Sequence, residues 1–170
     1  KRVTGVPPNL DTDTHWRPDT MEEAARMLKD FIGKAVPLPE VPPTPYKQAR
    51  EEVANLGDIA VMLRLPEAQD LYAKQAVAIR PVLNARGEFW QASRTADVLL
   101  LGDSYSNIYS LDAMGWGFSA GLAEQLSFQL QRPVDRIVRN DSGAFATRQM
   151  LARELAQGRD RLAGKKVVIW

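Results

Sequence analysis

The sequence of 170 residues contains no cysteine and a single histidine, His15. Without cysteine the chain can form neither a disulfide framework nor a thiolate metal site, and one histidine is too few for a zinc site of the usual ligand type. We therefore predict no metal and no cofactor. The lack of cysteine is compatible with both the cytoplasm and the periplasm, so it indicates neither compartment.

A strong excess of charge of one sign is also lacking. The net charge is +1, which provides no electrostatic footprint for a nucleic acid or for an anionic membrane surface. Within these residues we find neither an apolar run long enough to cross a membrane nor a signal-peptide pattern. We therefore predict that the partner of this chain is not a nucleic acid.

Hydrophobic residues make up 45% of the sequence, enough for one ordinary core. We predict a single domain over residues 1–170. Five prolines between residues 37 and 45 predict an extended, polyproline-like connector within this domain. Residues 165–170 have the pattern of a buried strand, and the sequence stops on it. We therefore expect a piece of a longer protein, cut at both ends.

An apolar run over residues 98–101 stops at Gly102-Asp103-Ser104. Such a run, bounded by a turn, predicts a buried strand of a parallel sheet. Ligands of parallel sheets bind beyond the carboxyl ends of the strands, and Ser104 lies at that point. Gly102 is expected to permit a sharp turn where a side chain would clash, and Asp103 is expected to brace the turn through backbone hydrogen bonds. A strand and turn without catalytic function is the alternative.

His15 lies in the stretch Asp11-Thr12-Asp13-Thr14-His15-Trp16. A serine needs a base to act as a nucleophile at neutral pH, and histidine is the usual base because it titrates near the working pH. A neighbouring carboxylate would fix the histidine tautomer and stabilise the imidazolium. Asp11 and Asp13 are both close enough along the chain for this function. A histidine on the surface with no catalytic function is the alternative.

The chain resembles a known family in two stretches, Asp13-Thr14-His15-Trp16 and Gly102-Asp103-Ser104-Tyr105-Ser106-Asn107. They are similar to the paired motifs of the SGNH-hydrolase-like domain of the alginate O-acetyltransferases, of the AlgJ and AlgX type. In that family the Asp-x-His pair precedes the serine, as it does here, whereas ordinary SGNH esterases carry the serine first. Further similar stretches are Leu56-Gly57-Asp58, Gly115-Trp116-Gly117 and Asn140-Asp141-Ser142-Gly143. The resemblance extends from Asp11 to Trp170 and selects Asp13 as the partner of His15.

The resemblance implies an α/β fold of the SGNH-hydrolase-like (flavodoxin-like) type, with three layers around a central parallel sheet and a permuted order of motifs. It implies a serine O-acetyltransferase that acts on an exopolysaccharide such as alginate, with Ser104, His15 and Asp13 as catalytic residues. It also implies a periplasmic location and a membrane-bound acyltransferase partner that delivers acetyl groups. A carbohydrate acetylesterase and a catalytically idle polysaccharide-binding domain are the alternatives.

Four further residues are candidates for an oxyanion hole or for substrate contacts. Asn140 and the backbone N–H of Gly143 follow the next predicted strand, at the same edge of the sheet as Ser104, where hydrogen-bond donors would stabilise an oxyanion. A plain turn that caps a helix is the alternative. For Trp116 we expect either stacking on a sugar ring or packing on the domain. Arg148 is expected either to reach the mouth of the site or to lie on a solvated face.

Hydrophobic periodicity predicts the remaining elements. Helices are expected over residues 18–33 with Phe31 on the inner face, and over residues 46–55, 57–65, 119–131 and 144–157. A hairpin is expected from residues 75–83 and 88–91 around the turn at residues 84–87. A further strand is expected over residues 134–139, and a loop over residues 107–118.

Overall fold

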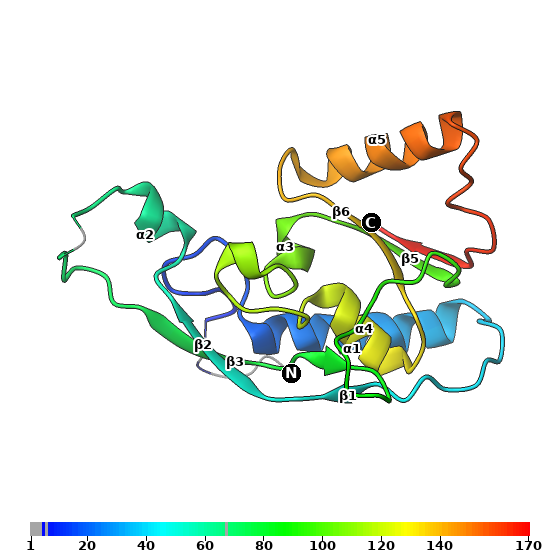
Figure 1. Cartoon of the computed structure of the whole chain (residues 1–170), viewed down its shortest axis with the longest axis horizontal. Coiled ribbons are helices and arrows are strands. Elements are labelled where there is room, and N and C mark those ends of the chain that lie inside the picture. Colours follow the sequence, from blue (N-terminus) through cyan, green and yellow to red (C-terminus); the bar gives the residue numbers. More distant parts are fainter. Residues whose placement is uncertain (1–4, 6, 67) are drawn as a thin grey trace.

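A three-stranded parallel sheet lies at the centre of the computed structural model, which describes residue 5, residues 7–66 and residues 68–170. Its strands are β5 (Val98–Gly102), β6 (Asp135–Val138) and β7 (Val167–Ile169), in the order β6-β5-β7 (Figure 1). Leu99 pairs with Asp135 on one side and with Val168 on the other. The predicted central parallel sheet is therefore confirmed.

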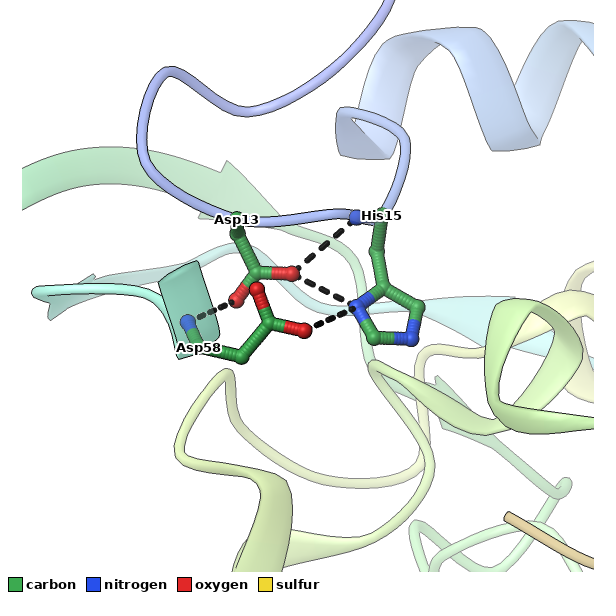
Figure 2. A group of neighbouring side chains, drawn as sticks. All are labelled: Asp13, His15 and Asp58. Atoms are coloured by element: carbon green, nitrogen blue, oxygen red, sulfur yellow. Dashed lines mark hydrogen bonds and ion pairs between the residues drawn. The ribbon is translucent and has the colours of Figure 1, made fainter. Parts of the chain in front are cut away.

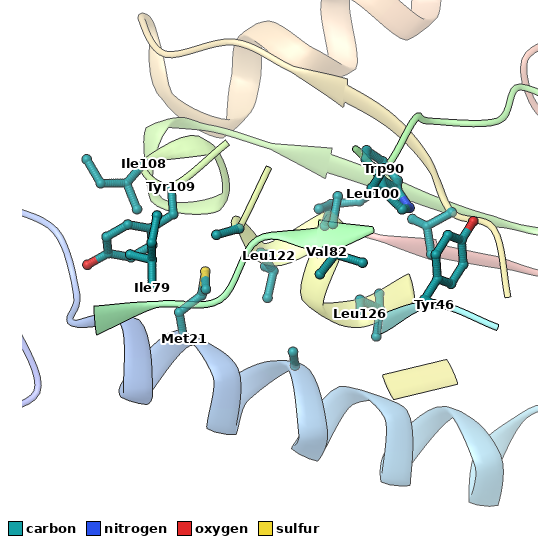
Figure 3. Packing of buried hydrophobic residues seen from close by; sticks show 14 of the residues in the cluster. Met21, Tyr46, Ile79, Val82, Trp90, Leu100, Ile108, Tyr109, Leu122 and Leu126 are labelled. Atoms are coloured by element: carbon teal, nitrogen blue, oxygen red, sulfur yellow. The ribbon is translucent and has the colours of Figure 1, made fainter. Parts of the chain in front are cut away.

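Helices cover both faces of this sheet. Helix α5 (Gly143–Ala156) lies on one face, and helices α1 (Pro18–Ala35) and α4 (Leu122–Leu130) lie on the other (Figure 1). The cause is the continuous apolar run of β5, in which every residue is buried. Val98 and Leu100 belong to the main core with α1 and α4, and Figure 3 shows Leu100 there. Leu99 and Leu101 instead pack against Ile137 and the α5 side. This alternation is what a strand covered on both faces requires.

Helix α1 follows the prediction at its start, with Pro18 in the first turn, where proline fits because its missing N–H would be unpaired anyway. The expected end at Gly33 is wrong, because the helix continues to Ala35. A Cβ at Gly33 would have nothing within 4 Å, so this glycine lies on an open helix surface and does not act as a stop signal. Phe31 is 68% exposed, which corrects its expected inner position.

The predicted helix over residues 46–55 is wrong. The segment forms strands β1 (Lys47–Gln48) and β2 (Glu51–Asn55). Strand β2 pairs antiparallel with β3 (Gln75–Ile79), and Val53 lies opposite Val77. A partner strand distant in sequence has therefore overridden the local helical pattern.

The predicted hairpin is corrected as a consequence of this pairing. Strand β3 takes β2 as its partner, and β4 (Val82–Leu83) takes β1. The chain still turns back after Asn84, where a single bridge joins Leu83 and Phe89 and the Trp90 N–H donates to the Val82 carbonyl at 2.9 Å. Residues 36–45 form neither helix nor strand, in agreement with the predicted connector.

Three short helical elements complete the described chain. Helix α2 (Asp58–Met62) confirms the expected helix, although it buries Ala60 and leaves Met62 exposed. Helix α3 (Ser104–Asn107) follows β5, and a 3-10 turn, η1 (Asp112–Met114), lies within the expected loop. Among the described residues, none of the helices has both the length and the apolar character needed to cross a membrane.

Candidate active site

Asp13 and His15 are joined side chain to side chain. The Nδ1 atom of His15 lies 2.6 Å from Oδ1 of Asp13 (Figure 2), and both residues are buried. Because a carboxylate can only accept, Nδ1 carries the proton in this hydrogen bond, which leaves Nε2 as the basic nitrogen of the neutral ring. The geometry therefore favours the tautomer that a general base requires.

The Asp13 carboxylate is held by several donors besides the imidazole. Oδ1 also accepts from the backbone N–H of His15 at 3.1 Å, and Oδ2 accepts from Trp116 Nε1 at 2.8 Å and from the backbone N–H of Asp58 at 3.0 Å. Burial disfavours the charged carboxylate, but the hydrogen bonds from His15, Trp116 and Asp58 outweigh it and lower the pKa of Asp13 to about 2. Asp13 is therefore ionised and fixed in orientation at neutral pH.

Asp58 is part of this network, and the sequence pattern gave it no function. It accepts from the backbone N–H of Thr14 at 2.8 Å and from Thr14 Oγ1 at 2.6 Å, so it fixes the loop between Asp13 and His15. Gly57, just before it, adopts φ +88° and ψ 155° and lies so close to Thr12 that a Cβ would overlap the Thr12 carbonyl. A glycine directly before Asp58 is the sequence signal that could have indicated a close backbone approach here.

Ser104 is the first residue of α3, directly beyond the carboxyl end of β5. The carboxylate of Asp103 accepts from the N–H of Tyr105 at 3.0 Å, as expected of a residue that braces this turn. Gly102 confirms the expectation that a side chain would clash at this turn. Its φ is not in the positive region, but a Cβ would overlap Ser106 Oγ. The glycine is therefore required for space between β5 and α3.

Tyr105 connects the turn at Ser104 to the loop at His15. Its hydroxyl donates to the Thr14 carbonyl at 2.6 Å, and its own carbonyl accepts from Trp16 Nε1 at 2.9 Å. Its ring centroid lies 5.2 Å from that of His15. The serine turn and the histidine loop are therefore neighbours, although about 90 residues separate them in the sequence.

The second ring nitrogen of His15 is unoccupied. Nε2 is buried, and it has no hydrogen-bond partner among the residues that the structure describes. In particular, no hydrogen bond joins it to Ser104. A buried imidazole with one nitrogen held by a carboxylate and the other unpaired has the capacity to accept a proton from a hydroxyl group that approaches it.

Asn140 lies beside the serine turn through strand register. Gly102 of β5 pairs with Val138 of β6, so Ser104 and Asn140 each lie two residues beyond the same paired position. The Asn140 side-chain oxygen accepts from Asn107 Nδ2 at 3.0 Å, and its Nδ2 donates to Met114 Sδ at 3.4 Å. A thioether is a weak acceptor, so the Asn140 amide retains donor capacity.

The other two predicted contact residues lie differently. Gly143 is the exposed first residue of α5, and among the described residues no hydrogen bond joins it to Ser104. Arg148 is exposed, and its guanidinium lies 4.0 Å from the ring centroid of Trp170 and 5.6 Å from that of Phe145. The structure thus places Arg148 toward the last strand of the described chain.

The structure corrects one of the two expectations for Trp116, namely that its ring stacks on a sugar. Its side chain is fully buried and its indole nitrogen is bonded to Asp13, so the ring is not available for stacking on a sugar. Its location indicates that it supports the carboxylate instead. The exposed aromatic residue on the same glycine-rich loop is Phe118, at 42%.

One cluster in the described chain has side chains of the types that bind metal ions. The ligand atoms of Asp13, His15 and Asp58 lie within 4.8 Å of one another (Figure 2). Their oxygens are, however, already acceptors for the donors of His15, Trp116, Thr14 and the Asp58 backbone. These three side chains therefore fit a hydrogen-bonded network that orients the His15 imidazole better than they fit a metal site.

Comparisons with known proteins agree on the fold. The structure is similar to the O-acetyltransferase domain of Pseudomonas putida AlgJ, with a TM-score of 0.70, 21% identity and coverage of 97% of this chain and 52% of that one. It is also similar to Pseudomonas aeruginosa AlgX, with a TM-score of 0.63, 17% identity and coverage of 96% and 35%. The chain thus spans about half, or less, of each of these relatives.

No curated protein matches the sequence. The family model described as the SGNH hydrolase-like domain of acetyltransferase AlgX matches residues 4–170. That match covers almost the whole chain and includes both motifs on which the sequence resemblance depended. The chain therefore belongs to the AlgX-type family of SGNH hydrolase-like acetyltransferase domains.

Proposed function

We propose that this chain is a serine-dependent O-acetyltransferase that passes an acetyl group to an exopolysaccharide such as alginate through an acetyl-serine intermediate. The observation that carries the proposal is the His15 imidazole. Its Nδ1 is bonded to Asp13 at 2.6 Å and its buried Nε2 is unpaired, while Tyr105 holds the turn at Ser104 against the same loop. A histidine held in this way is able to activate a serine hydroxyl that reaches its Nε2 atom, which supports the proposal.

In the proposed reaction Ser104 Oγ attacks the carbonyl carbon of an acetyl donor while His15 Nε2 takes the hydroxyl proton. The tetrahedral intermediate collapses, the leaving group takes the proton from Nε2, and acetyl-Ser104 remains. A sugar hydroxyl then gives its proton to Nε2 and attacks the acetyl carbon, and Ser104 regains a proton from the imidazolium. Asp13 stays ionised throughout and stabilises the imidazolium.

Asn140 is the side-chain donor best placed for the oxyanion, together with the backbone N–H of Ser104. Both lie at the carboxyl edge of paired strands, and the loss of one such donor typically costs about 3 kcal/mol of transition-state stabilisation. The N–H of Gly143 is a second candidate for this function.

The family relationship supports two wider proposals. One is a periplasmic location, and the other is a membrane-bound acyltransferase partner that supplies acetyl groups. Neither depends on the geometry of the triad, so the test of the triad stands apart from them.

The decisive experiment is intact mass spectrometry during incubation with p-nitrophenyl acetate. We expect a transient gain of one acetyl group, mapped by peptide analysis to Ser104. The gain should be absent from Ser104→Ala and suppressed in His15→Ala. Ser106→Ala, in the same motif, is the matched control. Ser106 Oγ donates to the Asp103 carbonyl, so this variant should still form the acetyl adduct.

Two outcomes would contradict the proposal. A folded protein that forms no adduct and releases no nitrophenol would indicate an idle polysaccharide-binding domain. An adduct that is lost to water at the same rate with and without oligosaccharide would indicate a carbohydrate acetylesterase.

A further inference from the structure

We propose that a cleft lined by arginines beside β6 binds a carboxylate-bearing segment of the acceptor glycan, a second site that continues from the serine turn. The inference rests on the proposed function for its acceptor, but the site is defined by its own residues. The cleft has a volume of about 600 Å³ and lies between α5 and the segment that follows α3. Its charge, its aromatic rim and its position each support the assignment.

Charge is the first argument. The lining includes Arg94, Arg136, Arg153 and Arg161 but a single carboxylate, that of Glu154, which is already engaged by Arg159 at 2.7 Å and 2.9 Å. This concentration of cations stands out in a chain whose net charge is only +1. An anionic ligand is therefore the one that the cleft attracts.

The four arginines differ in how far the protein itself uses them. Arg136 is paired with Glu124 at 2.8 Å, and Arg161 with Asp135 at 2.6 Å. The side chains of Arg94 and Arg153, by contrast, are exposed and form no hydrogen bond or salt bridge within the described part of the chain, although the charge of Arg94 contributes to lowering the pKa of Glu154. Two guanidinium groups are thus available to a ligand, and a guanidinium matches a carboxylate through two parallel hydrogen bonds.

Arg161 adds a buried donor that lacks a partner. Its side chain is 11% exposed, and its Nε is buried without a hydrogen-bond partner in the described part of the chain. Buried donors in proteins are nearly always paired. An acceptor oxygen of a bound ligand would satisfy this N–H.

An aromatic residue at the cleft indicates a sugar and not a bare anion. Phe118 lines the cleft, is 42% exposed, and is held edge-on by Phe89 with ring centroids 5.3 Å apart. A rigid, exposed aromatic face beside cations suits the apolar face of a pyranose ring whose carboxylate reaches an arginine.

The position connects this cleft to the proposed chemistry. Asn107 lines it, and Asn107 is the last residue of the four-residue helix that begins at Ser104. Its side chain is bonded to Asn140 at 3.0 Å. A glycan bound along the cleft would therefore continue toward Ser104 within about one helical turn, roughly 5 Å.

Calorimetric titration of the Ser104→Ala protein tests the assignment without any chemistry. The probes are a hexamer of uronic-acid sugars, a neutral cello-hexamer, and inorganic phosphate and sulfate as free anions. We expect the uronate hexamer to bind at least 10-fold more tightly than either other class. The Arg94→Gln/Arg153→Gln double variant should weaken it at least 10-fold, and Phe118→Ala about 3- to 10-fold. The matched control is Arg50→Gln/Arg86→Gln, which removes the same charge elsewhere and should bind within twofold of the parent.

Each other outcome would overturn the assignment. An unchanged affinity in the Arg94/Arg153 variant, equal losses in the Arg50/Arg86 control, or no binding of the uronate hexamer would show that the cleft is not its site. Phosphate bound as tightly as the hexamer would identify a site for a free anion only. Far-ultraviolet circular dichroism checks that every variant is folded. Because binding is measured in Ser104→Ala, failure of the acyl-enzyme test does not affect this result, and the reverse also holds.

Discussion

The ring of Tyr105 lies 5.2 Å from the imidazole of His15, and the Tyr105 hydroxyl donates to the carbonyl of Thr14 just before it. One side chain next to the proposed nucleophile thus contacts the loop of the proposed base in two ways. No hydrogen bond joins Ser104 to His15 within the described chain, so Tyr105, together with Tyr109, whose hydroxyl donates to the Trp16 carbonyl at 2.6 Å, helps to set their relative position. Because these contacts are with the imidazole and its loop, we assign Tyr105 as a positioning residue.

Replacement of Tyr105 should slow acylation without a matching change in KM. Tyr105→Phe loses one hydrogen bond, and we expect kcat to fall about 2- to 10-fold. Tyr105→Leu also loses the ring contact with His15, worth about 0.5–1.5 kcal/mol, so kcat should fall further in this variant. His15 is the sole histidine, so its imidazole nitrogen signals in NMR spectra report the change directly. Tyr72→Leu is the control, and unchanged imidazole signals in Tyr105→Leu would refute the positioning function.

Asp13→Asn should lower the acylation rate far more than Asp11→Asn. Asp13 bonds to His15 Nδ1 at 2.6 Å, whereas Asp11 is exposed and its backbone N–H donates to Gln75. An amide in place of the Asp13 carboxylate would favour the wrong imidazole tautomer, and such a loss costs about 10⁴-fold in a serine triad. Asp11→Asn should stay within about twofold. The rate of nitrophenol release measures both, and the reverse ranking would exclude Asp13 as the partner.

Acid should destabilise the fold through Asp13. Burial opposes its ionisation, but hydrogen bonds from His15, Trp116 and Asp58 lower its pKa to about 2, against about 3.9 for an unfolded aspartate. A lowered pKa stabilises the folded state above the unfolded value, so the contribution is complete above about pH 4 and is lost as the pH falls toward 2. The contribution to the free energy of unfolding amounts to about 2–3 kcal/mol. Urea unfolding at several pH values should show that the free energy of unfolding decreases with falling pH in the parent, and that it decreases less steeply in Asp13→Asn. The same dependence of unfolding free energy on pH in both proteins would contradict this prediction.

Gly57→Ala should destabilise the protein more than Gly87→Ala. Both glycines have a positive φ, +88° and +80°, but a Cβ at Gly57 would overlap the Thr12 carbonyl, whereas at Gly87 nothing lies within 4 Å. We expect a loss of about 1–2 kcal/mol in unfolding free energy for Gly87→Ala and about 2–5 kcal/mol for Gly57→Ala, because overpacking adds to the strain. Urea unfolding measures both. Gly57→Ala should also reduce the acylation rate, since the loop of Asp13 is displaced. Equal losses in the two variants would show that the close approach to Thr12 is unimportant.

The sequence by itself determined the central features of the fold. The apolar run of β5 could only be buried on both faces, because every residue in it is hydrophobic up to Gly102, and so a parallel sheet between helices was predictable. Pro18 and the apolar spacing behind it predicted the start of α1. The order of the two motifs, with Asp13 and His15 before Ser104, pointed to the family.

Tertiary structure decided what depends on contacts between distant segments. Residues 46–55 have a local helical pattern but form β1 and β2, because β3 and β4 supply partner strands that the pattern does not contain. Trp116 was ambiguous in sequence, and burial against Asp13 decided its function. The support that Asp58 gives to the loop of Asp13, and the contact between Tyr105 and His15, join parts of the chain that local sequence cannot relate. The physical reason is that hydrogen bonds and packing across the fold depend on three-dimensional distance, whereas periodicity records only which face of an element is buried.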